Sequence, residues 1–192
     1  MMPVGCTMSE SAREGALVVG GSEAERSRWA AALADLVDPV AAADGTEALE
    51  RVGPGTEILL VHRDLPGRTA TELVAAVRER GITVRAALLT PETPETDVVE
   101  RGFDAWLLTP VEEGLLQQTV EGLLACRRYD RAIADLYALA SEQATEEAET
   151  MEVRERIEAA RANADAALEA VESIDREALL ANSPAAFRDD HA

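Results

Sequence analysis

Five short apolar runs, each followed by a polar, amphipathic stretch, constrain the fold of this chain more than any other feature of its sequence. Aliphatic runs of this length are typical of strands buried on both faces of a parallel sheet. Because a stretch with helical periodicity follows each run, the pattern predicts a doubly wound, five-stranded parallel α/β sheet. The runs are ALVVG (16–20), PVAAA (39–43), EILLV (57–61), VRAALLT (84–90) and AWLLT (105–109).

The helices expected between these strands have start and stop signals. Ser22 and Glu25 have the spacing of a capping box, which predicts a helix start at residue 22, and Trp29 would lie on the apolar face of that helix. Gly81 and Gly102 stand where a glycine commonly ends a helix. The expected helices span 22–37, 44–52, 69–81, 94–102 and a last one that opens at Pro110 and runs to about residue 128.

The character of the chain changes near residue 126, where strand patterns end and alanine and glutamate dominate. Apolar residues recur at alternating spacings of four and three from Tyr129 to Ala140 and again from Val153 to Val171. This spacing predicts two helices of about 20 residues, packed as an antiparallel hairpin or in a coiled-coil dimer. The predicted organisation is a flexible tail (1–14), an α/β domain (15–125), a helical domain (126–182) and a flexible tail (183–192).

The charge balance indicates the salt conditions in which this chain functions. It holds 37 acidic and 18 basic residues, for a net charge of −19, and every basic residue is arginine. A lysine-free, acidic surface suits multimolar salt, where the Debye length is about 3 Å or less. Such acidity repels the phosphates of nucleic acids, which disfavours DNA binding without excluding it. We interpret the composition as halophilic adaptation of a cytoplasmic protein, with no secretory signal and no run long enough to span a membrane.

The two cysteines, Cys6 and Cys126, have no cysteine or histidine near them at metal-ligand spacing. We expect unreactive thiols rather than a disulfide or a metal site.

Short motifs at the ends of the predicted strands resemble a known family. LPG after the third strand, ALLT at the fourth and LLTP at the fifth resemble a response-regulator receiver domain. Residues 126–182, which begin near RRYDRAIADLYALASEQATEEAE, resemble the HalX domain that follows receivers in haloarchaeal regulators. The two resemblances cover about residues 15–182. They imply a role in signal transduction or transcription control rather than an enzyme.

The resemblance to receivers also implies which residues occupy the phosphorylation site. A working receiver has an acidic pair that holds Mg²⁺, a nucleophilic aspartate, a Ser or Thr, and a lysine followed by proline. Three of these four parts are missing here, so we expect a degenerate receiver without metal or cofactor. Gly20 and Gly21 replace the acidic pair, His62 the aspartate and Thr109 the lysine, whereas Thr90, Pro110 and the switch aromatic Trp106 are retained.

The sequence favours a regulator that acts through protein partners without phosphorylation, with His62 as a neutral imidazole in a local hydrogen bond. A homodimer is compatible with the helical stripes, and Trp106 is compatible with a partner surface. Three alternatives stay open: a non-standard phosphoacceptor at His62 or Asp64, a small-ligand sensor, and contact with DNA or a partner through an arginine cluster. The sensor pocket would comprise Ser22, His62, Thr90 and Thr109, and the cluster Arg127, Arg128 and Arg131.

Overall fold

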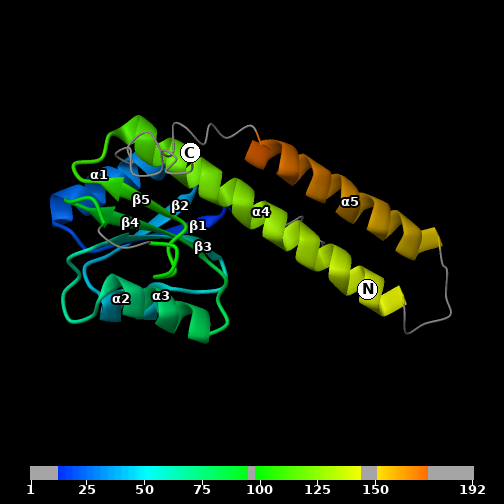
Figure 1. Ribbon diagram of the computed structural model, residues 1–192, viewed down its shortest axis with the longest axis horizontal. Coiled ribbons are helices and arrows are strands. Elements are labelled where there is room, and N and C mark those ends of the chain that lie inside the picture. The colour runs from blue at the N-terminus through cyan, green and yellow to red at the C-terminus, as the bar shows by residue number, and fades with distance from the viewer. Residues whose placement is uncertain (1–12, 95–97, 144–150, 173–192) are drawn as a thin grey trace, which may run out of the picture.

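A five-stranded, all-parallel sheet forms the centre of the molecule, in the order β2-β1-β3-β4-β5. The computed structural model describes residues 13–94, 98–143 and 151–172 (Figure 1). The predicted doubly wound sheet is confirmed, and each strand begins and ends within one residue of its predicted run. The strands are β1 (Gly15–Val19), β2 (Asp38–Ala42), β3 (Thr56–His62), β4 (Arg85–Thr90) and β5 (Ala105–Leu108).

Helices cover both faces of this sheet. The helices are α1 (Glu23–Leu33), α2 (Gly45–Arg51), α3 (Ala70–Glu79), α4 (Glu113–Gln143) and α5 (Met151–Glu172). The helices α1 and α4 lie on one face and α2 and α3 on the other (Figure 1). The side chains of β3 alternate between the two cores, since Leu60 packs with α1 and α4, whereas Leu59 packs with α2 and α3. The central strand is therefore buried on both sides, as its continuous apolar run predicted.

Capping boxes fix the starts of two helices. Ser22 caps α1 and Glu25 completes the predicted capping box, while Thr69 and Glu72 form a second box at α3. Gly81 follows α3 with a positive φ of 76°, as expected for a residue that ends a helix. The helix α1 ends at Leu33, four residues before its predicted end, because the chain turns there and Leu33 O accepts the N–H groups of both Leu36 and Val37.

The prediction of a helix at 94–102 is wrong in the part that the structure describes, because residues 98–102 form turns. The N–H of Arg101 bonds to Val98 O and that of Gly102 to Val99 O, a spacing of three residues rather than four. Adjacent β-branched valines are weak helix formers. Val98 and Phe103 are instead buried against the sheet. Residues 95–97 lie outside the described part.

The last helix of the α/β part continues without a break into the helical region. The helix α4 has 31 residues, so the predicted boundary at residue 126 falls inside it. The helix α5 runs antiparallel along the distal part of α4 (Figure 1), with Ala160 and Ala164 buried in the contact. The antiparallel hairpin, one of the two predicted arrangements, is therefore present. Cys126 is a free, half-buried thiol on α4, and Cys6 lies outside the described residues.

Of the predicted N-terminal tail, only Arg13 and Glu14 are described. The backbone of Glu14 accepts a 2.9 Å hydrogen bond from the N–H of Asp38, and Arg13 Nη1 donates to Ala34 O at 3.0 Å. The rest of that tail and the predicted tail at 183–192 lie outside the described residues. Among the described residues, no helix is both long and apolar enough to cross a membrane.

Candidate functional site

Five of the residues that the receiver resemblance singled out lie at the carboxyl edge of the sheet. The pairings Val19 with Val61, His62 with Leu89, and Thr90 with Leu108 bring the ends of β1, β3, β4 and β5 together. In open α/β sheets, ligands bind at this edge. Gly20, Gly21, His62, Thr90 and Thr109 all lie here, so the chemistry of this edge determines what the fold can do.

His62 is the last residue of β3, and its imidazole is packed and hydrogen-bonded. Its ring stacks on the indole of Trp29 from α1, with centroids 6.3 Å apart and planes inclined by 21°. The N–H of Asp64 donates to His62 Nδ1 at 3.2 Å. An imidazole that accepts at Nδ1 carries its proton on Nε2 when neutral. Trp29 is only 1% exposed. The carboxyl end of β3 therefore holds a ring that packs against the apolar core.

The two glycines after β1 have a backbone conformation that other residues rarely adopt. Their φ angles are +83° at Gly20 and +70° at Gly21. A Cβ on Gly20 would lie 3.0 Å from His62 Cβ and 3.0 Å from Leu65 Cδ1, and a Cβ on Gly21 would lie 3.3 Å from ring atoms of Trp29. Carboxylate side chains would be strained at both positions. The turn after β1 thus has a geometry that favours glycine at both positions.

The Mg²⁺ ion that the receiver resemblance implies does not fit these residues. Magnesium prefers several oxygen ligands in octahedral geometry, and Gly20, Gly21 and His62 supply no carboxylate. Glu25 is nearby, but its Oε2 accepts hydrogen bonds from Ser22 N at 2.8 Å and Ser22 Oγ at 2.7 Å. The backbone bond from Ser22, followed by its hydroxyl, lowers the pKa of Glu25. Among the described residues, no group of three or more His, Cys, Asp or Glu side chains could hold a metal.

Two of the three hydroxyl groups at this edge have partners within the chain. Thr90 is fully buried, and its Oγ1 donates to Glu92 O at 2.9 Å. Ser22 Oγ donates to Glu25, as described above. The N–H of Thr109 bonds to Thr90 O at 2.8 Å, and a cis peptide bond joins Thr109 to Pro110. Two of the three hydroxyls of the hypothetical ligand pocket are therefore engaged within the chain. Trp106, the expected switch residue, is half-buried against the core on the α2–α3 face.

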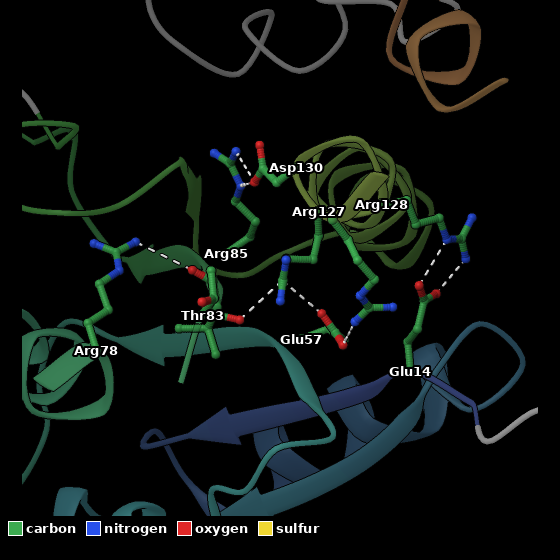
Figure 2. Close-up of polar contacts among 10 residues, drawn as sticks. Glu14, Glu57, Arg78, Thr83, Arg85, Arg127, Arg128 and Asp130 are labelled. Carbon is green, nitrogen blue, oxygen red and sulfur yellow. Dashed lines mark hydrogen bonds and ion pairs between the residues drawn. The ribbon is translucent and has the colours of Figure 1, made fainter. Parts of the chain in front are cut away.

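The arginine cluster lies on α4 at the opposite, amino edge of the sheet, and its charges are paired within the chain (Figure 2). Arg127 Nε lies 2.8 Å from Glu57 Oε2 but directs its N–H to Thr83 O at 3.1 Å. Arg131 pairs with the other oxygen of Glu57. Arg128 donates to Glu14, with Nε 2.9 Å from Oε1. These contacts leave little uncompensated positive charge for phosphates of DNA.

Sequence reasoning missed Glu57, the carboxylate that receives two of these arginines. Glu57 is only 5% exposed and lies at the start of β3. Its signal in the sequence was a single acidic residue at the head of an otherwise apolar, buried run. A charge buried in this way needs a partner.

Comparison with known proteins agrees with the fold and with the regulatory context. No family model matches the chain. A Haloferax volcanii protein described as a "Putative transcriptional regulator" is 34% identical over 134 residues, which cover 65% of this chain and 23% of that protein. The chain therefore spans less than a quarter of the length of this relative.

Solved structures similar to this chain are receiver proteins. The chemotaxis response regulator CheY4 of Vibrio cholerae has 25% sequence identity and a TM-score of 0.53, over 58% of this chain and 98% of that one. A receiver domain of a Luxo repressor from Vibrio parahaemolyticus has 16% identity and a TM-score of 0.57, over 63% and 97%, and shows the fold alone. The α/β part has the receiver fold, and a helical region follows it. The chain is thus similar to proteins of signalling and transcription control.

Proposed function

We propose that this chain is a phosphorylation-independent, response-regulator-like protein of haloarchaeal signal transduction and transcription control. A degenerate receiver (15–125) is joined to a HalX helical domain (126–182), and output passes through contacts with protein partners. The protein works in the cytoplasm without a cofactor and is not an enzyme. The receiver fold and the haloarchaeal relative support the regulatory part of this proposal.

One observation carries the phosphorylation-independent part: His62 stacks on buried Trp29 beside a diglycine turn with positive φ. Aspartyl phosphorylation requires a carboxylate nucleophile and a divalent cation to offset the phosphoryl charge. Gly20, Gly21 and His62 supply no carboxylate for either role, and Asp64 is an exposed loop residue whose backbone N–H donates to His62 Nδ1.

The direct test is phosphoryl transfer from a small donor. The full chain is incubated with acetyl phosphate and Mg²⁺ in molar KCl and its intact mass is measured, beside an active receiver as positive control. We expect no added phosphoryl group on this chain. Incorporation that disappears in Asp64→Ala or in His62→Ala would instead establish a phosphoacceptor at that residue.

The regulatory role is tested by chromatin immunoprecipitation of a tagged copy in a halophilic host. We expect discrete enriched loci, which persist in Arg128→Gln because the protein is tethered through a partner. Loss of the loci in that variant would indicate direct DNA contact through the arginine cluster. A flat profile from a well-expressed protein would exclude a role at promoters.

A further inference from the structure

We propose that Glu57 is the positioning residue of an ionic clamp that fixes the direction in which α4 leaves the sheet. The clamp would set the orientation of the α4–α5 hairpin from the amino edge of the sheet, opposite His62. The inference rests on the proposed function in one respect, that the hairpin carries the output. The clamp comprises Glu14, Glu57, Arg85 and Asp104 on the sheet side and Arg127, Arg128, Asp130 and Arg131 on α4 (Figure 2).

The central contact makes the rotation of α4 specific. Arg127 and Arg131 are four residues apart and so share one face of the helix, from which both reach the carboxylate of Glu57. A shift of α4 by one residue would rotate that face by about 100° and remove both partners. Because a buried carboxylate without a partner is costly, other rotations of α4 are strongly disfavoured.

Two further ion-pair contacts flank Glu57. In one of them the cation lies on the sheet side, and in the other it lies on α4. On one side Arg85, from the sheet, donates Nη1 to Asp104 Oδ1 at 2.5 Å and Nε to Asp130 Oδ2 of α4 at 3.1 Å. Burial would lower the pKa of Arg85, but the hydrogen bonds and charges of Asp104 and Asp130 outweigh it and raise the pKa. On the other side the cation, Arg128, is on the helix and the anion, Glu14, precedes β1. This alternation of sign fixes the lateral position of α4.

Because α4 is one continuous helix, a change in its direction at the clamp also moves the hairpin. From Arg127 to the end of α4 at Gln143 the helix extends about 24 Å at 1.5 Å per residue, and α5 packs along this distal part. A small change of angle at Glu57 therefore displaces the hairpin tip. Glu57 and His62 lie near opposite ends of β3, so the hairpin direction is set away from the edge where receivers are phosphorylated.

The test is a distance measurement by pulsed electron paramagnetic resonance on the full chain. Spin labels are placed at Glu50→Cys on α2 and Asn163→Cys on α5, both exposed, in a Cys6→Ser, Cys126→Ala background. We expect one narrow distance distribution in this background and a broader, shifted one in Glu57→Gln. Glu92→Gln is the matched control, since it removes an exposed ion pair with Arg63 away from α4, and its distribution stays narrow.

A second variant covers the case in which Glu57→Gln fails to fold. Arg131→Gln removes one arm of the clamp from a half-exposed helix position, and it should broaden the distribution too. Distributions equal to the background in the folded variants would overturn the clamp. The distance result is independent of phosphoryl incorporation and of genomic loci, so failure of the proposed function and failure of the clamp are separate outcomes.

Discussion

The indole of Trp29 and the imidazole of His62 stack at a centroid distance of 6.3 Å, and this contact joins α1 to the carboxyl end of β3. Trp29 belongs to the core on the α1–α4 face, whereas His62 ends the central strand. At this edge of the sheet the imidazole of His62 is therefore part of the packing between α1 and β3.

Restoring an aspartate at this place should not restore phosphorylation. In His62→Asp the carboxylate would face Trp29 and the diglycine turn without a cation, and the variant would lose a stacked ring pair worth about 1 kcal/mol. We expect an unfolding free energy lower by about 1 kcal/mol or more, measured by urea denaturation. With Trp106→Phe as background, the fluorescence reports Trp29 alone.

The matched control for this variant is His62→Phe, which keeps a ring on Trp29 and loses only the Nδ1 acceptor, so its loss should be smaller. Mg²⁺-dependent labelling of His62→Asp, or a stability equal to that of the parent, would contradict this account of the edge.

Alanine substitutions at three glycines distinguish the stability cost of backbone strain from that of steric contact. Gly20 has a positive φ and close neighbours, Gly67 has a φ of +75° with no atom within 4 Å of its Cβ position, and Gly53 has no such neighbour and no positive φ. Left-handed geometry costs a residue with a Cβ about 1–2 kcal/mol. We expect no loss in Gly53→Ala, about 1 kcal/mol in Gly67→Ala, and a larger loss in Gly20→Ala, measured by urea denaturation. Equal losses at Gly20 and Gly67 would show that the space beside His62 can relax.

The strands were predictable because burial on both faces produces uninterrupted apolar runs, and the starts of α1 and α3 because capping residues are local signals. The location of His62 at the end of β3 followed from the apolar run that precedes it. The contact of His62 with Trp29 was not predictable, since it depends on how α1 is rotated against the sheet. Glu57 and Arg131 are 74 positions apart, and charge patterns alone do not pair residues at that separation. Turns at 98–102 replaced a predicted helix because Val98 anchors the segment to the core.

The capping boxes predict that the free energy of unfolding decreases at acidic pH. The backbone N–H of Ser22 is the largest cause of the lowered pKa of Glu25, and that of Thr69 does the same for Glu72. A carboxyl whose pKa is lower in the folded state stabilises the fold above its ordinary, unfolded-state pKa of 4.5, and this contribution is lost as the pH falls through the folded-state pKa. We therefore expect the stability difference between the parent and Glu25→Gln to shrink below pH 4.5.

Urea midpoints measured against pH test this expectation. Glu23→Gln is the control, because Glu23 lies in the same first turn but outside the capping box. Ser22→Ala should cost about 1 kcal/mol, the usual value of an N-cap. A difference between the parent and Glu25→Gln that stays constant through the acid range would refute the assignment.

Substitutions in the buried clamp and in exposed ion pairs should lose stability with a different dependence on salt. Glu57→Ala leaves two arginines facing a site that is 5% exposed, and losing one partner of a buried pair costs about 3–5 kcal/mol. Because the side chain of Arg131 is 46% exposed, we expect the lower end, about 3 kcal/mol. Glu92→Ala removes a pair whose glutamate is 79% exposed and should cost less than about 1 kcal/mol.

The salt dependence of these two losses is the decisive measurement. At 1 M salt the Debye length is about 3 Å, so the contribution of Glu92 should vanish there. Most of the loss in Glu57→Ala should persist from low to molar KCl, since a partly buried pair is screened much less than an exposed one. In a double-mutant cycle, Glu57→Ala and Arg131→Ala together should cost less than the sum of the single variants, because each removes the same contact. Additive losses that fade with salt would mean that Glu57 behaves as a surface charge and does not hold α4.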